Sequence, residues 1–174
     1  MQIEVFSDIV CPWCYAGFAR LEQALAQRPG TPFRVTWLPF ELNPDLPSEG
    51  MERSAYLLQR FGDVNRFAAG QQQLRELGHE LGIDYRFERV ARMPNTRRAH
   101  VLLAWARRGA RQSMLKRALL AAYFTEGRDV GDPQVLVAIA GEAGLDAGAA
   151  RARSRIARCT RRSRCSRSRR AAGT

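Results

Sequence analysis

The sequence has almost no lysine, no long apolar run and no secretory signal. One lysine accompanies 27 arginines among 174 residues, and no apolar stretch approaches the ~18 residues that a membrane-spanning helix needs. At the N-terminus, Glu4 stands where the apolar segment of a secretory signal would begin. These absences predict a cytoplasmic protein with no membrane partner.

Acidic residues are missing from the last 24 residues. Residues 151–174 contain ten arginines and no Asp or Glu, whereas residues 1–150 carry 18 basic and 17 acidic side chains. The net charge of +11 is therefore a property of an Arg/Ser-rich tail, in which Ile156 is the only large apolar side chain. We predict that this tail, residues 151–174, is disordered or read out of frame.

Two interpretations of the tail stay open. In the first, its arginines contact nucleic-acid phosphates without sequence preference, which is the only way in which nucleic acid is expected as a partner. In the second, GC-rich coding DNA is read in a shifted frame. Codons for Arg-Ile-Ala-Arg-Cys-Thr-Arg-Arg can, shifted by one base, encode Ala-Asp-Arg-Gln-Val-Tyr-Ala-Glu, an ordinary helical sequence.

Cysteine is also scarce, with four in the chain. A cytoplasmic chain keeps its thiols reduced, so a structural disulfide framework is not expected. Cys11 and Cys14 form a Cys-Pro-Trp-Cys motif, and a zinc site would need two more ligands beside them. The remaining ligand candidates are poorly placed: Cys159, Cys165, His79 and His100. We therefore expect no metal, and we interpret both histidines as surface or satisfied core residues rather than catalytic bases.

The sequence pattern predicts an α/β fold in a single domain. Apolar, β-rich stretches at 2–7 and 33–40 predict two strands, and the segment that begins at Cys11 predicts the helix between them. Residues 1–46 are thus a βαβ unit. A helical insertion is predicted for 47–150, with five helices at 51–61, 64–81, 95–108, 112–125 and 132–143. Asn95 is the predicted N-cap of the helix at 95–108, and Asp132 is that of the helix at 132–143.

The Cys-Pro-Trp-Cys motif has a definite chemistry at a helix start. Backbone N–H groups and the positive end of the helix dipole stabilise an anion there, so the pKa of Cys11 is predicted to fall. Cys14 lies one helical turn later on the same side, where it can resolve a mixed disulfide. Pro12 suits the first helical position, and Trp13 offers an apolar surface near the sulfur.

Four separated motifs carry a family resemblance: Ser7-Asp8-Ile9-Val10-Cys11-Pro12-Trp13-Cys14-Tyr15-Ala16-Gly17, Pro39-Phe40-Glu41-Leu42-Asn43-Pro44, Pro94-Asn95-Thr96 with Ala99-His100, and Ala122-Tyr123-Phe124-Thr125-Glu126-Gly127. Together they resemble the DsbA-like thioredoxin family, in its FrnE-like cytosolic branch, from residue 1 to about 150. The resemblance implies a thioredoxin-like fold with an inserted all-helical subdomain.

The activity implied is that of a thiol–disulfide oxidoreductase or isomerase acting on protein or small-molecule thiols and disulfides. By the same resemblance Cys11 is the attacking thiol and Cys14 the resolving one. No cofactor is expected beyond the redox-active Cys11–Cys14 disulfide, with glutathione as a candidate co-substrate. A related branch, the glutathione-dependent 2-hydroxychromene-2-carboxylate isomerases, usually has serine at the position of Cys11 and supplies the alternative function. The oligomeric state is left open.

The sequence also departs from the family. After the helical insertion the family continues with a Val-Pro-type segment, two strands and a final helix, and the Arg/Ser-rich tail stands in their place, as in a truncated or frameshifted chain. We therefore expect a two-stranded sheet with an exposed edge. Val5, Phe18 and Trp37 are expected to be partly exposed beside it.

Overall fold

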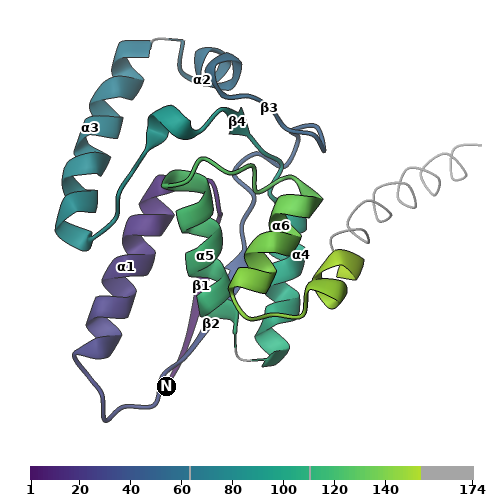
Figure 1. Cartoon of the computed structure of the whole chain (residues 1–174). Helices are drawn as coiled ribbons and strands as arrows, with labels where there is room; N and C mark the ends of the chain where they lie inside the picture. The colour runs from purple at the N-terminus through teal and green to yellow at the C-terminus, as the bar shows by residue number, and fades with distance from the viewer. Residues whose placement is uncertain (63, 110, 154–174) are drawn as a thin grey trace, which may run out of the picture.

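The computed structural model describes residues 1–62, 64–109 and 111–153 (Figure 1). It begins with the predicted βαβ unit: β1 (Gln2–Ser7), α1 (Pro12–Ala26) and β2 (Arg34–Pro39). The two strands pair in parallel, with Gln2 opposite Arg34 and Ser7 opposite Pro39. Within the described residues this sheet has two strands, as predicted.

The predicted helices of the insertion are all present. They are α2 (Arg53–Phe61), α3 (Val64–Leu81), α4 (Arg97–Ala106), α5 (Gln112–Phe124) and α6 (Pro133–Glu142), with short 3₁₀ turns η1 (Phe87–Arg89) and η2 (Arg107–Gly109). α4 and α5 pack against β2, α6 packs against α5, and α3 packs against α1. α2 and α3 lie at the end of the βαβ unit where α1 begins (Figure 1).

The insertion is not purely helical, which corrects the prediction in detail. β3 (Met51–Glu52) and β4 (Arg92–Met93) form a two-residue antiparallel pair, with Met51 opposite Met93. Gly50 makes this approach possible, because it has φ of +70° and a Cβ there would lie 2.5 Å from the Met93 carbonyl oxygen. Strands of two residues are too short to produce an alternating pattern in the sequence.

Helix caps follow the sequence at one of the two predicted positions. The Asp132 carboxylate accepts hydrogen bonds from the backbone N–H groups of Gln134 and Val135, as an N-cap should. At α4 the N-cap is Thr96, so the assignment of Asn95 is wrong by one residue. Asn95 still contributes, because its Oδ1 accepts from the backbone N–H of Arg97 at 3.1 Å.

The core lies between the sheet and the helices α4, α5 and α6. Its fully buried side chains include Ile9, Leu102, Leu115, Leu119, Leu136 and Ile139. The expected exposure of Phe18 and Trp37 is wrong, because both side chains are buried. The two rings contact each other at a centroid distance of 5.0 Å, and the Trp37 indole N–H donates to the Ser113 hydroxyl of α5 at 2.9 Å. The Gln112 side chain of α5 accepts from the Trp37 backbone N–H at 2.9 Å and donates to its carbonyl at 2.8 Å. Val5 is half-buried, as expected.

Exposed aromatic side chains gather instead near the ends of the two strands. Phe6 at the end of β1 is 67% exposed, and Phe40 just after β2 is 52% exposed. Residues 147–153 are helical after Asp146, and the predicted tail from residue 154 onward lies outside the described residues. No helix in the described part of the chain is long and apolar enough to cross a bilayer.

Candidate active site

The Cys-Pro-Trp-Cys motif forms the first turn of α1. Cys11 is the N-cap, with the extended backbone that an N-cap adopts, and Pro12 occupies the first helical position. The backbone N–H of Cys14 donates to the Cys11 carbonyl at 3.0 Å, which closes the turn. Both cysteines are half-buried free thiols. Trp13 is 54% exposed beside them.

The two thiols share one negative charge. A hydrogen bond from Cys11 lowers the pKa of Cys14 to about 5, against the effect of burial. The Ser7 hydroxyl, the backbone at Asp8 and the Lys116 ammonium lower it as well. The same sulfur–sulfur hydrogen bond, together with burial, raises the pKa of Cys11. At neutral pH the pair therefore holds a single thiolate.

This charge placement differs from the expectation that the pKa of Cys11 falls. The backbone N–H groups of Trp13 and Cys14 do act to lower it, as the helix start predicts. Cys14 receives more help because three further groups surround it. These groups are at the end of β1, at Asp8 directly after it, and on α5, and the local pattern around the motif does not reveal the contribution of α5.

Tyr85 holds the loop from the other side. Its hydroxyl donates to the Pro12 carbonyl at 2.7 Å. Its ring packs edge-on against Tyr15 and stacks on Phe87 at a centroid distance of 5.1 Å. Burial raises the pKa of Tyr85, so this hydroxyl stays protonated and remains a donor.

Three titratable side chains lie buried beneath the cysteines, and we call Asp8, His100 and Lys116 the buried charge cluster. Asp8 and Lys116 are fully buried, and His100 is nearly so. The Asp8 Oδ1 lies 3.1 Å from the His100 Nε2, and the Asp8 Oδ2 accepts from the Leu42 N–H at 2.7 Å. The Lys116 ammonium donates to the Asp8 carbonyl at 3.2 Å.

The environment changes the proton affinity of this cluster. Burial lowers the pKa of Lys116 to about 8, although the nearby charges of Cys14, Asp8 and Cys11 act to raise it. Burial acts to raise the pKa of Asp8, but hydrogen bonds from His100 and the Leu42 N–H overcome this effect and hold it below 3.8. A permanent carboxylate and a readily deprotonated ammonium therefore lie next to the thiolate.

No local pattern in the sequence predicts this cluster. His100 was interpreted as a surface or satisfied core residue; it is buried, and its partner Asp8 is 92 residues away. Asp8 and Lys116 are 108 residues apart. One signal was present: the single lysine of an arginine-rich chain stands among Leu115, Leu119 and Leu120 on the apolar face of a helix.

A cavity of about 640 Å³ opens directly beside Cys11. Its wall includes Cys11, Pro12 and Trp13 from the motif, and it does not include Cys14. The two sulfurs therefore have different surroundings: Cys11 lies on the cavity, and Cys14 lies against Ser7 and Lys116.

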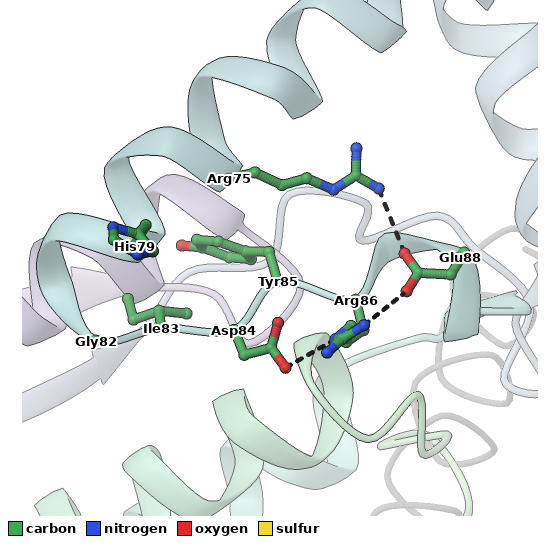
Figure 2. Close-up of a pocket in the computed structure, with 8 residues that line it drawn as sticks. All are labelled: Arg75, His79, Gly82, Ile83, Asp84, Tyr85, Arg86 and Glu88. Carbon is green, nitrogen blue, oxygen red and sulfur yellow. Dashed lines mark hydrogen bonds and ion pairs between the residues drawn. The ribbon is translucent and has the colours of Figure 1, made fainter.

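A second cavity, of about 520 Å³, lies between the end of α3 and the segment that follows it (Figure 2). Figure 2 shows that four of its charged side chains are joined in one row, because Glu88 contacts both Arg75 and Arg86. Arg75 pairs with Glu88 at 3.3 Å, and Arg86 pairs with Asp84 at 2.7 Å. Among the described residues, no group of three or more His, Cys, Asp or Glu is placed to hold a metal ion. Cys159 and Cys165 lie outside this part of the chain.

A parallel βαβ unit with a Cys-x-x-Cys motif at the start of its helix defines a thioredoxin-like fold. The sequence profile of the DSBA-like thioredoxin domain matches residues 2–163. The chain belongs to this family, as the resemblance predicted.

Similar proteins agree with this assignment. The chain is 30% identical to an uncharacterised protein, YwbO, of Bacillus subtilis over 146 residues, which are 84% of this chain and 68% of that protein. The structure of the present chain is similar to that of a probable DsbA oxidoreductase from Streptomyces coelicolor, with a TM-score of 0.77 and 35% identity. The match covers 88% of this chain and 67% of that one. A cytosolic disulfide reductase, DsbM, from Pseudomonas aeruginosa, solved with GSH, has the same fold, with a TM-score of 0.63, 18% identity, and coverage of 98% and 78%.

Proposed function

We propose that this protein is a thiol–disulfide oxidoreductase in which Cys11 and Cys14 are the redox-active pair. The observation that carries the proposal is the different surroundings of the two sulfurs. Cys11 lies on the cavity, where a substrate can reach it, and Cys14 lies against the buried charge cluster. A pair with one sulfur on a cavity and the second sulfur one helical turn further along is what attack followed by resolution requires.

In the first step Cys11 attacks a substrate disulfide. As it does so, its proton moves along the sulfur–sulfur hydrogen bond to Cys14, so the negative charge moves from Cys14 to Cys11. The Cys11 sulfur bonds to one substrate sulfur, the substrate S–S bond breaks, and the other substrate sulfur leaves as a thiolate that is protonated by water. The product is a mixed disulfide on Cys11.

In the second step Cys14 releases the substrate. Its proton passes to Lys116, whose pKa of about 8 leaves part of the population neutral and able to accept it. The Cys14 thiolate attacks the Cys11 sulfur, the bond to substrate breaks, and the second substrate sulfur leaves as a thiolate. Two electrons have passed from the protein dithiol to the substrate disulfide, and a thiol reductant must restore the dithiol.

The cellular setting belongs to the same proposal. We place the protein in the cytoplasm, where thiols are kept reduced and the reductase direction is favoured. Glutathione is the proposed reductant. The name of the Pseudomonas relative, a cytosolic disulfide reductase solved with GSH, supports both points.

Reduction of insulin by dithiothreitol with catalytic amounts of the full chain tests the activity. We expect the wild type to accelerate precipitation of the insulin B chain, and Cys11→Ser to abolish the acceleration. Cys14→Ser should accumulate mixed disulfides on Cys11, because attack still occurs and release does not. No acceleration by the wild type would overturn the proposal. If the wild type does not accelerate insulin reduction but turns over a chromene carboxylate in the presence of glutathione, the isomerase alternative is favoured.

A further inference from the structure

The cavity beside Cys11 has walls from several parts of the chain. Its wall is formed by the active-site motif, α2, α3, the segment from Phe87 to Met93, and the end of α5. Its volume of about 640 Å³ is that of a site for a small organic molecule. Its apolar lining includes Leu57, Leu74, Phe87, Val90, Met93 and Phe124.

One face of α2 is directed into this cavity. The α2 residues on its wall are Arg53, Tyr56, Leu57, Arg60 and Phe61, which follow the i, i+3, i+4, i+7, i+8 spacing of a single helix face. None of the side chains of α2 is buried, and Phe61 remains 48% exposed. In the described structure, the apolar part of this face is thus covered only in part by protein.

The charges on this wall have one sign. Arg53 and Arg60 line the cavity, and no carboxylate lines it within the described residues. Arg53 is half-buried, with its guanidinium 5.9 Å from the centroid of the Phe87 ring. The neighbouring Glu52 is exposed and is engaged at the start of α2, where its carboxylate accepts from the backbone N–H groups of Ser54 and Ala55.

We propose that this cavity binds a small anionic disulfide, such as an aryl disulfide carrying a carboxylate, with its ring among the apolar side chains and its carboxylate at Arg53. This inference rests on the proposed function and names its substrate class. The substrate sulfur then lies at Cys11. Arginine suits the role, because its guanidinium binds a carboxylate through two parallel hydrogen bonds.

The aryl disulfide reacts through the same two thiol–disulfide exchange steps. Cys11 bonds to one sulfur of the aryl disulfide, and the first aryl thiolate leaves. Cys14 then displaces the second, so one disulfide becomes two aryl thiols as the protein dithiol becomes a disulfide.

Two aryl disulfides that differ in charge test whether Arg53 binds a carboxylate of the ligand. The full chain, reduced, is mixed with 5,5′-dithiobis(2-nitrobenzoate), which carries carboxylates, or with 4,4′-dithiodipyridine, which is neutral. The readout is the rate at which the tryptic peptide 1–20, which contains Cys11 and Cys14, acquires its internal disulfide, measured by mass spectrometry after an acid quench. This readout leaves Cys159 and Cys165 out of the measurement.

Arg53→Gln should slow the carboxylate probe roughly tenfold, the effect of losing a charge-assisted hydrogen bond, and should leave the neutral probe unchanged. Arg28→Gln, on the exposed loop after α1, removes the same charge away from the cavity and should affect neither probe. If Arg53→Gln slows both probes equally, Arg53 acts on the thiols rather than on the ligand, and the proposal is overturned.

A filling variant tests the cavity itself. A Cβ at Gly70, on the cavity wall, meets no atom within 4 Å, so Gly70→Leu places its side chain in free space. It should slow both aryl disulfides and leave the small bis(2-hydroxyethyl) disulfide unchanged. Gly141→Leu on α6 is the control, because it also replaces a helical glycine whose added Cβ would meet no atom within 4 Å, and it lies away from the cavity.

The outcomes separate the two proposals. If no probe oxidises the pair, the proposed function fails. If the hydroxyethyl probe oxidises it while Arg53→Gln and Gly70→Leu leave both aryl probes unaffected, only the substrate class is wrong. A peptide disulfide slowed by both variants, with the aryl probes unaffected, would assign the cavity to a polypeptide substrate and overturn the inference.

Discussion

Replacing Lys116 with methionine removes a buried charge and keeps an unbranched side chain of similar length. Burial lowers the pKa of Lys116 from 10.5 to about 8. This difference corresponds to about 3 kcal/mol of folding free energy at neutral pH, where the ammonium must stay charged away from water. Loss of the hydrogen bond to the Asp8 carbonyl offsets about 1 kcal/mol of it. We therefore expect Lys116→Met to raise the free energy of unfolding by about 2 kcal/mol at neutral pH.

The sign of the pH dependence follows from the same pKa. The unfolded chain keeps the lysine proton up to pH 10.5, whereas the folded protein releases it near pH 8. Between these values the unfolded state binds more protons, so the stability of the wild type rises with pH by up to about 1.4 kcal/mol per unit. Lys116→Met lacks this rise, so the difference between the two proteins shrinks as pH increases.

Urea unfolding of both proteins at a series of pH values between about 7 and about 9.5 measures this difference. Both are used with the Cys11–Cys14 disulfide formed, so that these two thiols do not titrate. The charges of Cys14 and Cys11 act to raise the pKa of Lys116, so the rise of the wild type should begin near pH 8 in the reduced protein and at lower pH once the disulfide has removed these charges. A stability difference that is the same at every pH would refute the reasoning, because it would mean that the pKa of Lys116 is not lowered.

Three further substitutions have expected outcomes. Asp8→Asn should lower the unfolding free energy by about 2 kcal/mol in urea titrations, because one amide cannot accept from both backbone N–H groups that the carboxylate now satisfies. The lowered pKa of Asp8 stabilises the fold above pH 3.8, and this contribution is lost as pH falls through the folded pKa, so the variant should also lose less stability in acid. Gln112→Leu should cost about 3 kcal/mol by calorimetry, since it leaves the Trp37 N–H and two carbonyls without their partner; an unchanged melting temperature would contradict this. Tyr85→Phe removes the donor to the Pro12 carbonyl and should cost about 1 kcal/mol in urea and speed alkylation of the motif, whereas identical rates would show that the loop is held without it.

Much of the fold could be predicted because its signals are local. The helix start at the Cys-Pro-Trp-Cys motif, the two strands around it and the cap at Asp132 depend on neighbouring residues, and the structure confirms them. The position of the N-cap of α4 was wrong by one residue, because Asn95 and Thr96 are both good cap residues. The pair β3–β4 carried too few residues to leave a pattern.

The parts that could not be predicted depend on contacts between distant segments. Trp37 is buried beside α5, where its backbone N–H donates to Gln112 and its indole N–H donates to Ser113, 75 and 76 residues further along the chain. The pKa of Cys14 is lowered first by the hydrogen bond from Cys11, and then by Ser7, the backbone at Asp8 and the distant Lys116, whereas the pattern around the motif pointed to Cys11. A single lysine on an apolar helix face was the available sign of a buried charge, but its partners could not be named without the fold.

The most direct test of the redox-active pair is its equilibrium with glutathione. The full chain is incubated in mixtures of reduced and oxidised glutathione, and the remaining thiols are alkylated. The mass of the tryptic peptide 1–20 is then measured by mass spectrometry. We expect Cys11 and Cys14 to lose their two alkylation sites together, in one reversible two-electron transition between dithiol and internal disulfide. Two thiols that stay alkylatable in every mixture, or that take up glutathione singly without forming the internal disulfide, would contradict the proposed function.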